Sequence, residues 1–114
     1  MQQGMEGSEA WTRCLAAVRE AADIAATFDG RLSHEPIDQG VRLAFAHPGR
    51  PARHVRITLW QRDGGIRIVL QAETDASTED AVYDGPASPT SAMQATLAAI
   101  GRWYGDEVRR LAAP

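Results

Sequence analysis

The sequence predicts an α+β domain, a two-layer sandwich in which two helices lie on one face of an antiparallel sheet. Apolar residues recur at helical spacing near both ends of the chain, and three central runs alternate apolar with polar side chains. An aspartate–glycine turn joins two of those runs. Alternation gives the sheet one apolar face, so both amphipathic helices must cover that face. The expected order is an N-terminal helix, an antiparallel meander of three to five strands, and a C-terminal helix.

The composition fits one globular domain. The chain has 114 residues, of which 44% are hydrophobic and 24% are charged. Its single cysteine excludes a disulfide framework and a multi-cysteine zinc site. No apolar run approaches the ~20 residues of a membrane span, and the N-terminus lacks the pattern of a signal peptide. We expect a flexible segment at residues 1–7, one domain over residues 8–114, a cytoplasmic location and no membrane partner.

The first helix is expected over residues 9–28. Ser8 is a suitable N-cap, Glu9 favours the first turn through the helix dipole, and Asp29-Gly30 ends the helix. One apolar stripe follows the helical period: Trp11, Cys14, Leu15, Val18, Ala21, Ala22, Ala25 and Phe28. Because Cys14 lies within this stripe, we expect a buried structural thiol rather than a nucleophile.

Three strands are expected from alternation with period two. The inward residues are Val41, Leu43 and Phe45, then Val55, Ile57 and Leu59, then Ile66, Ile68 and Leu70. A two-residue loop at Asp63-Gly64 suits a type I′ turn, in which positive φ is required. This loop aligns Leu59 with Ile68, and it aligns Trp60 with Arg67 on the opposite face. The pairing keeps every large aliphatic side chain on one face.

Two flanking segments are less regular. Residues 31–34 are expected to add a short strand, which Pro36 and the turn after it would end. Residues 73–90 are acidic and rich in turn formers. Within them, residues 81–83 form either an edge strand or part of a loop.

The second helix is expected to start at Ser88, as N-cap, with Pro89 in the first turn. Its apolar stripe consists of Met93, Leu97, Ile100, Trp103, Tyr104, Val108 and Leu111. Glu107 falls among these residues, where a carboxylate must find a partner, reach solvent or stay protonated. Two interpretations remain open: an end-of-helix residue near Arg110 or Arg19, or an acid in a possible pocket between helix and sheet.

Motifs of the common enzyme classes are absent from the sequence. There is no glycine-rich phosphate loop before a helix and no Gly-x-Ser-x-Gly elbow. The spacing of the three histidines does not predict that their side chains meet at one metal ion; they are His34, His47 and His54. We therefore expect no catalytic residues, no metal and no cofactor.

The uncovered face of the sheet is the candidate binding surface. All 12 basic residues are arginines; seven lie in residues 31–67, whereas residues 68–90 hold five acids and no arginine. Alternation places Arg42, Arg56, Trp60 and Arg67 on that face. Tryptophan and arginine are enriched at interface hot spots, and these four side chains would suit an acidic protein surface.

The leading hypothesis is a small non-enzymatic protein-binding module of the inhibitor, immunity-like, chaperone or adaptor type. Its partner is an acidic protein or a second copy of the chain, giving a dimer. One alternative is a small enzyme or ligand-binding protein with a pocket near Glu107. Another is single-stranded nucleic-acid binding with Trp60 as a stacking platform. The net charge of −3 and pI of about 5.5 argue against nucleic acid as the partner.

Overall fold

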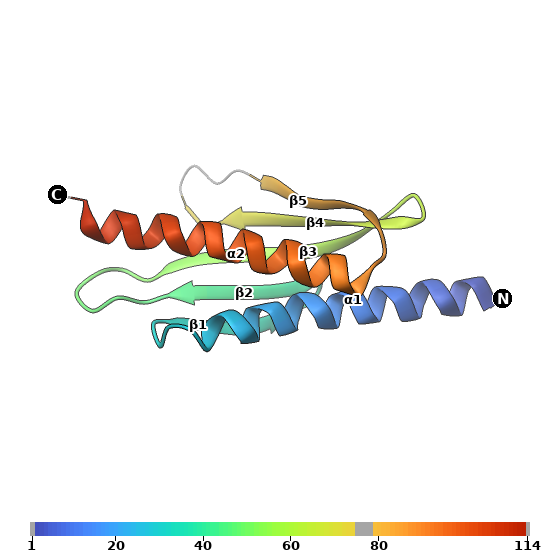
Figure 1. Cartoon of the computed structure of the whole chain (residues 1–114), viewed down its shortest axis with the longest axis horizontal. Coiled ribbons are helices and arrows are strands. Elements are labelled where there is room, and N and C mark those ends of the chain that lie inside the picture. The colour runs from blue at the N-terminus through green and yellow to red at the C-terminus, as the bar shows by residue number, and fades with distance from the viewer. Residues whose placement is uncertain (1, 75–78, 114) are drawn as a thin grey trace.

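The fold confirms the predicted two-layer sandwich. A computed structural model describes residues 2–74 and 79–113. The elements in chain order are α1 (Gln2–Ala26), β1 (Leu32–Ile37), β2 (Gly40–Phe45), β3 (Arg53–Arg62), β4 (Gly65–Ala72), β5 (Glu79–Pro86) and α2 (Pro89–Ala112). The five strands form one antiparallel sheet in the order β1-β2-β3-β4-β5. Both helices lie on the same face of this sheet and run in the same direction (Figure 1).

The β3–β4 hairpin has the predicted register. Leu59 pairs with Ile68 and Trp60 pairs with Arg67. The turn has positive φ angles at both central residues, 32° at Asp63 and 77° at Gly64. This is the conformation that a type I′ turn requires and that an Asp-Gly sequence tolerates.

The two edge strands differ from the sequence prediction in detail. β1 continues past the expected stop, and Pro36 lies within it, paired with Val41. Pro36 is tolerated there because β1 is an edge strand and one side of it needs no ladder donors. At the other edge, residues 81–83 belong to β5, which pairs with β4 through an irregularity between Ile68 and Val69.

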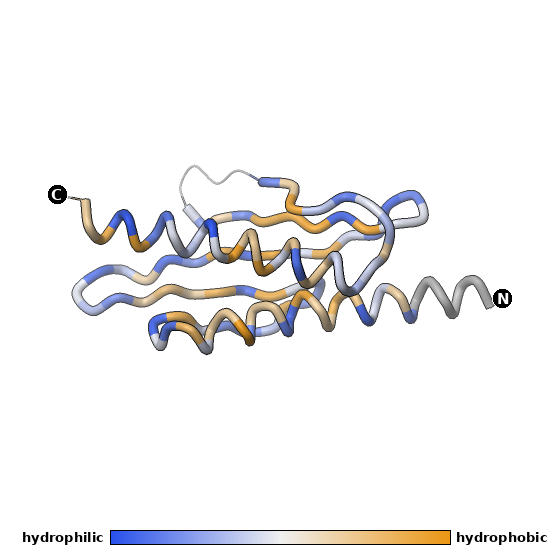
Figure 2. The backbone as a smooth tube through the Cα atoms, in the orientation of Figure 1, coloured by the Kyte–Doolittle hydropathy of each residue, from blue (hydrophilic) through white to orange (hydrophobic). Residues whose placement is uncertain are grey.

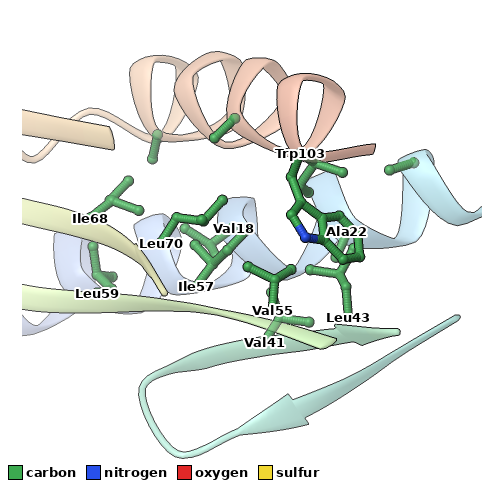
Figure 3. Close-up of a cluster of buried hydrophobic side chains, with 14 of the residues drawn as sticks. Val18, Ala22, Val41, Leu43, Val55, Ile57, Leu59, Ile68, Leu70 and Trp103 are labelled. Carbon is green, nitrogen blue, oxygen red and sulfur yellow. The ribbon is translucent and has the colours of Figure 1, made fainter. Parts of the chain in front are cut away.

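The hydrophobic core lies between the sheet and the helices. Figure 2 shows apolar residues along the strands and polar residues in the β2–β3 loop. The largest fully buried apolar side chains include Leu43, Phe45, Ile57, Leu59, Ile66, Ile68 and Ile100. Trp103 points from α2 into this cluster, toward the side chains of the strands (Figure 3).

Helix α1 departs from its predicted bounds at both ends. The N-cap predicted at Ser8 is wrong, because the helix already includes this residue. Helix propensity does not explain this early start, because Gly4 and Gly7 are poor helix formers. The helix ends at Ala26, and Phe28, predicted to be in the apolar stripe, is 81% exposed in the turn that follows.

Helix α2 begins as predicted. The Ser88 side chain accepts a hydrogen bond from the Ser91 N–H, and Pro89 occupies the first turn. The buried residues are Ala92, Thr96, Ala99, Ile100, Trp103 and Glu107, whereas five of the predicted stripe residues are only half-buried. Those five are Met93, Leu97, Tyr104, Val108 and Leu111. The shift follows from close contact with α1, which buries several alanines of each helix.

Contacts with α1 and with β3 hold the β1–β2 turn in place. Arg19 of α1 donates to the carbonyl oxygens of Ile37 (2.6 Å) and Gly40 (3.0 Å). A Cβ at Gly40 would lie 1.8 Å from the carbonyl oxygen of Ile57, so only glycine fits there.

Neither helix, over the described residues, has the length and apolarity of a membrane-spanning segment.

Candidate functional site

The four predicted binding residues all lie on the uncovered face of the sheet. Register pairs Arg42 with Arg56 and Trp60 with Arg67, and alternation directs all four away from the helices. Trp60 is 43% exposed, and its indole N–H donates to the Thr58 hydroxyl at 3.0 Å. The tryptophan is therefore held in place while part of its ring faces solvent.

Arg42 is already occupied by acids of the same chain. Its guanidinium donates two hydrogen bonds to Glu73, at 2.7 and 3.1 Å, and one to Glu35 at 3.4 Å. The hydrogen bonds from Arg42 hold the pKa of Glu73 below its usual value. Arg42 therefore stabilises the face instead of offering a free cation to a partner.

The remaining arginines of this face divide into one paired and two unpaired. Arg62 lies 3.4 Å from Asp84 of β5. Arg56 and Arg67 form no side-chain hydrogen bond and no ion pair within residues 9–74 and 79–113, but each has an acid nearby: Arg56 helps to lower the pKa of Glu73, and Asp84 is opposite Arg67 on β5. We call Arg56, Trp60 and Arg67 the open-face patch.

An apolar residue lies under this patch. Val69 is only 6% exposed although neither helix covers it. Its partner on β3 is Thr58, so its diagonal neighbours are Arg56 and Trp60. Long and aromatic side chains at diagonal positions are within reach of the residue on the neighbouring strand. The open-face patch thus combines an apolar centre with two unpaired guanidinium groups.

Glu107 lies in a second candidate site, on the helix side of the sheet. It is 5% exposed, and its Oε1 accepts a hydrogen bond from Arg53 Nε at 3.1 Å. Arg110 Nε is 3.9 Å from the same oxygen. Arg110 was one expected neighbour, whereas Arg19 is engaged at the β1–β2 turn and does not pair with Glu107.

The principal partner of Glu107 was missed from the sequence. Arg53 precedes Val55 by two residues, so the alternation that places Val55 inward also places Arg53 on the helix side. Both partners of the resulting ion pair line two clefts, whose volumes are about 430 and 420 Å³. Glu107 therefore lines clefts on the helix side of the sheet, and whether either of them serves as a binding pocket stays a hypothesis.

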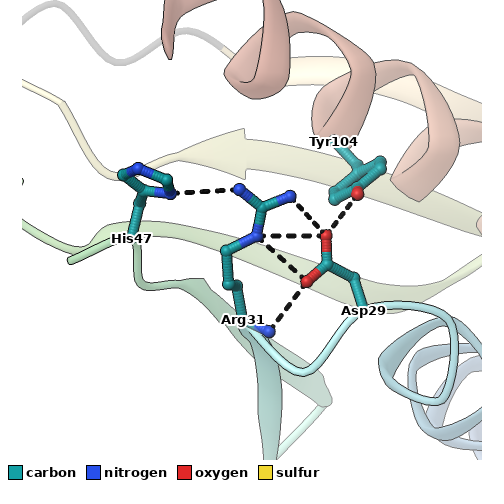
Figure 4. Close-up of polar contacts among 4 residues, drawn as sticks. All are labelled: Asp29, Arg31, His47 and Tyr104. Atoms are coloured by element: carbon teal, nitrogen blue, oxygen red, sulfur yellow. Dashed lines mark hydrogen bonds and ion pairs between the residues drawn. The ribbon is translucent and has the colours of Figure 1, made fainter.

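Four polar side chains form a network of hydrogen bonds and ion pairs at the same end of the molecule (Figure 4). Asp29, in the α1–β1 turn, accepts hydrogen bonds from the Arg31 guanidinium at 2.7, 3.0 and 3.2 Å and one from the Tyr104 hydroxyl. These donors, Arg31 first, hold the pKa of Asp29 far below its usual value, and Asp29 raises the pKa of Tyr104. The Arg31 guanidinium also lies 5.0 Å from the ring centre of Phe45. The network joins the α1–β1 turn to α2.

The three histidines occupy separate environments. His34 Nε2 is 3.3 Å from Asp23 of α1, His47 Nδ1 is 3.0 Å from Arg31, and His54 lies on β3 facing away from the helices. The described side chains include no group of three or more metal-ligating residues that could hold an ion. Cys14 is fully buried, as expected, and burial raises the pKa of its thiol.

Comparisons with models of protein families, with curated proteins and with solved structures find no match to this chain. The architecture alone does not identify a function, because one fold can carry many unrelated sites. The assignment of function therefore depends on the chemistry of the open-face patch and of the clefts beside Glu107.

Proposed function

We propose that this protein is a non-enzymatic binding module that holds an acidic segment of a partner protein on its open-face patch. The observation that carries the proposal is the position of Trp60. It is 43% exposed in a central strand, with Arg56 on the same strand and Arg67 directly opposite. An exposed aromatic side chain flanked by unpaired cations is a typical composition for the centre of an interface.

The chemistry of the patch favours carboxylates. Arginine presents a planar fork of donors that binds a carboxylate through two parallel hydrogen bonds. Arg42 is engaged by Glu35 and Glu73, so the acids of a partner would be directed to Arg56 and Arg67. Because β3 and β4 lie inside the sheet with a neighbour on each side, the backbone under the patch is already ordered. Less conformational entropy is then lost on binding.

The other candidate partners fit the patch less well. A two-fold dimer brings the same surface of both copies together, so a dimer centred on Trp60 would oppose arginines with arginines. Nucleic-acid binding requires several free cations along a groove, and this face offers two unpaired arginines in a chain of net charge −3.

The proposal can be tested by titrating isotope-labelled protein with two short synthetic peptides. One peptide has glutamates around a central leucine, and the other has glutamines in their place. We expect the acidic peptide to shift the amide resonances around Thr58, Trp60 and Val69. Arg67→Gln should weaken its binding by roughly tenfold, since a hydrogen-bonded charge contributes about 1.5–3 kcal/mol. Trp60→Ala should weaken it by a similar factor, because it removes the aromatic anchor of the interface.

Arg13→Gln is the matched control. Arg13 is an exposed arginine of α1 that pairs with Glu9, far from the open face, so its removal should leave peptide binding unchanged. Equal binding of both peptides would overturn the proposal. So would tighter binding of a single-stranded oligonucleotide with a steep salt dependence, or a dimer that Trp60→Ala dissociates in the absence of peptide.

A further inference from the structure

We propose that the cleft beside Glu107 that Phe45 and Leu111 line binds a small carboxylate carried on an apolar body. The cleft lies between the last turns of α2 and the β2–β3 loop, and its volume is about 430 Å³. That volume falls in the lower part of the range of roughly 300–1,000 Å³ usual for ligand pockets. The cleft is on the helix side of the sheet, so it is independent of the open-face patch.

The apolar part of the lining comes from three elements. Phe45, Pro51 and Leu111 contribute from β2, from the loop and from α2. Phe45 is 2% exposed and is fixed by an edge contact with the Tyr104 ring at 5.7 Å between centroids. Proline restricts the loop backbone through its ring. A flat or branched hydrocarbon group would therefore meet a surface that needs little rearrangement.

The charged part of the lining has an excess of cations. Arg53 and Glu107 neutralise each other across 3.1 Å. Arg110 is 3.9 Å from Glu107 and is largely exposed, and Arg50 has no ion pair within the described residues. Arg50 from the loop and Arg110 from α2 thus supply two further guanidinium groups to the lining of the cleft.

His47 belongs to the same lining, and its Nδ1 lies 3.0 Å from the Arg31 guanidinium. Its other ring nitrogen, Nε2, points away from Arg31 (Figure 4). Nε2 is therefore a polar atom that Arg31 does not engage.

A single negative charge fits this environment better than two. Glu107 and the last residues of α2 line the cleft, and the C-terminal end of a helix carries a negative partial charge. Both repel anions, and the repulsion grows with the charge of the ligand. A monocarboxylate balances these groups against Arg50 and Arg110, whereas a phosphate dianion is repelled more strongly.

The test uses four probes added to isotope-labelled protein. Phenylacetate has both the charge and the apolar body, phenylacetamide lacks the charge, acetate lacks the ring, and phenyl phosphate carries the larger charge. We expect phenylacetate to bind most tightly and to shift the amides of the β2–β3 loop and of the last turn of α2. Phenylacetamide and acetate should each bind at least about tenfold more weakly.

Single substitutions distinguish binding of phenylacetate in this cleft from a general attraction of the anion to surface arginines. Arg50→Gln and Arg110→Gln should each weaken phenylacetate binding by about tenfold, because each removes one charged donor. Arg109→Gln is the control, since Arg109 is exposed in the same turn, pairs with Asp106 and does not line the cleft. Arg50 lies in an exposed loop, so its replacement leaves the core intact.

Four outcomes would overturn the inference. Resonance shifts spread over the whole surface would indicate weak general binding, as would an equal effect of Arg109→Gln and Arg110→Gln. Equal binding of phenylacetamide would show that the charge is irrelevant, and tighter binding of phenyl phosphate would contradict the choice of a carboxylate. Trp60→Ala should leave phenylacetate binding unchanged, which keeps this result separate from that of the proposed function.

Discussion

Replacing Arg53 should lower the free energy of unfolding more than replacing Glu107, its partner in a buried ion pair. The Glu107 side chain is 6% exposed, whereas that of Arg53 is 37% exposed. Arg53→Met leaves a carboxylate buried with only Arg110 nearby, at 3.9 Å. Glu107→Gln leaves an arginine that water can reach and an amide oxygen that can still accept its hydrogen bond. Stability should therefore depend more on Arg53 than on Glu107.

The magnitudes follow from these exposures. Breaking a fully buried ion pair from one side costs about 3–5 kcal/mol. Arg110 and the open cleft relieve part of this, so we expect Arg53→Met to lower the free energy of unfolding by about 2–3 kcal/mol. Glu107→Gln should cost about 1 kcal/mol, the contribution of one ordinary hydrogen bond.

Urea denaturation measures both values, provided that the slope with denaturant stays constant. Arg13→Met is the control for loss of an exposed pair with Glu9, and it should cost no more than about 1 kcal/mol. A loss for Arg53→Met that is no larger than the loss for Glu107→Gln would refute the reasoning.

Three further predictions concern the core and the polar network. Leu59→Ala and Ile68→Ala should each lower the free energy of unfolding by about 2–5 kcal/mol in urea, and an unchanged midpoint would show that the assigned apolar face is wrong. The buried Thr96 hydroxyl has no hydrogen-bond partner within the described residues, so Thr96→Val should raise stability by about 1 kcal/mol, and a loss would contradict this. The folded-state pKa of Asp29 lies below its unfolded value, so its contribution is present at neutral pH and is lost as pH falls below about 4. Asp29→Asn should therefore be less stable than the parent at pH 7, with a difference that shrinks in acid; urea midpoints across pH test this, and a constant difference would contradict it.

The sheet was predictable because its signals are local. The Asp63-Gly64 turn fixes the β3–β4 register, and alternation assigns the inner face without further information. The start of α1 was not predictable, since neighbouring residues on both sides of Ser8 can be helical. The buried face of α2 depends on its contact with α1, which helical periodicity alone does not reveal.

The candidate sites were predictable only in part. The alternation of side chains along the strands correctly placed Trp60 and its neighbours on the uncovered face. It gave no information on ion pairs between residues that are far apart in the sequence. Arg42 bonds to Glu73, 31 residues away, and Arg53 bonds to Glu107, 54 residues away. Such pairs form only when tertiary structure brings the elements together, so one sequence cannot tell a free arginine from an occupied one.

The most direct test of the central claim is a reversal of charge on the open-face patch. The double variant Arg56→Glu/Arg67→Glu retains Trp60 and leaves the buried core untouched. We expect it to lose the glutamate peptide and to bind a matched lysine peptide, whereas the parent protein binds only the glutamate peptide. Unchanged preference for the glutamate peptide in the variant, or no preference in the parent, would contradict the assignment of this face as the binding surface.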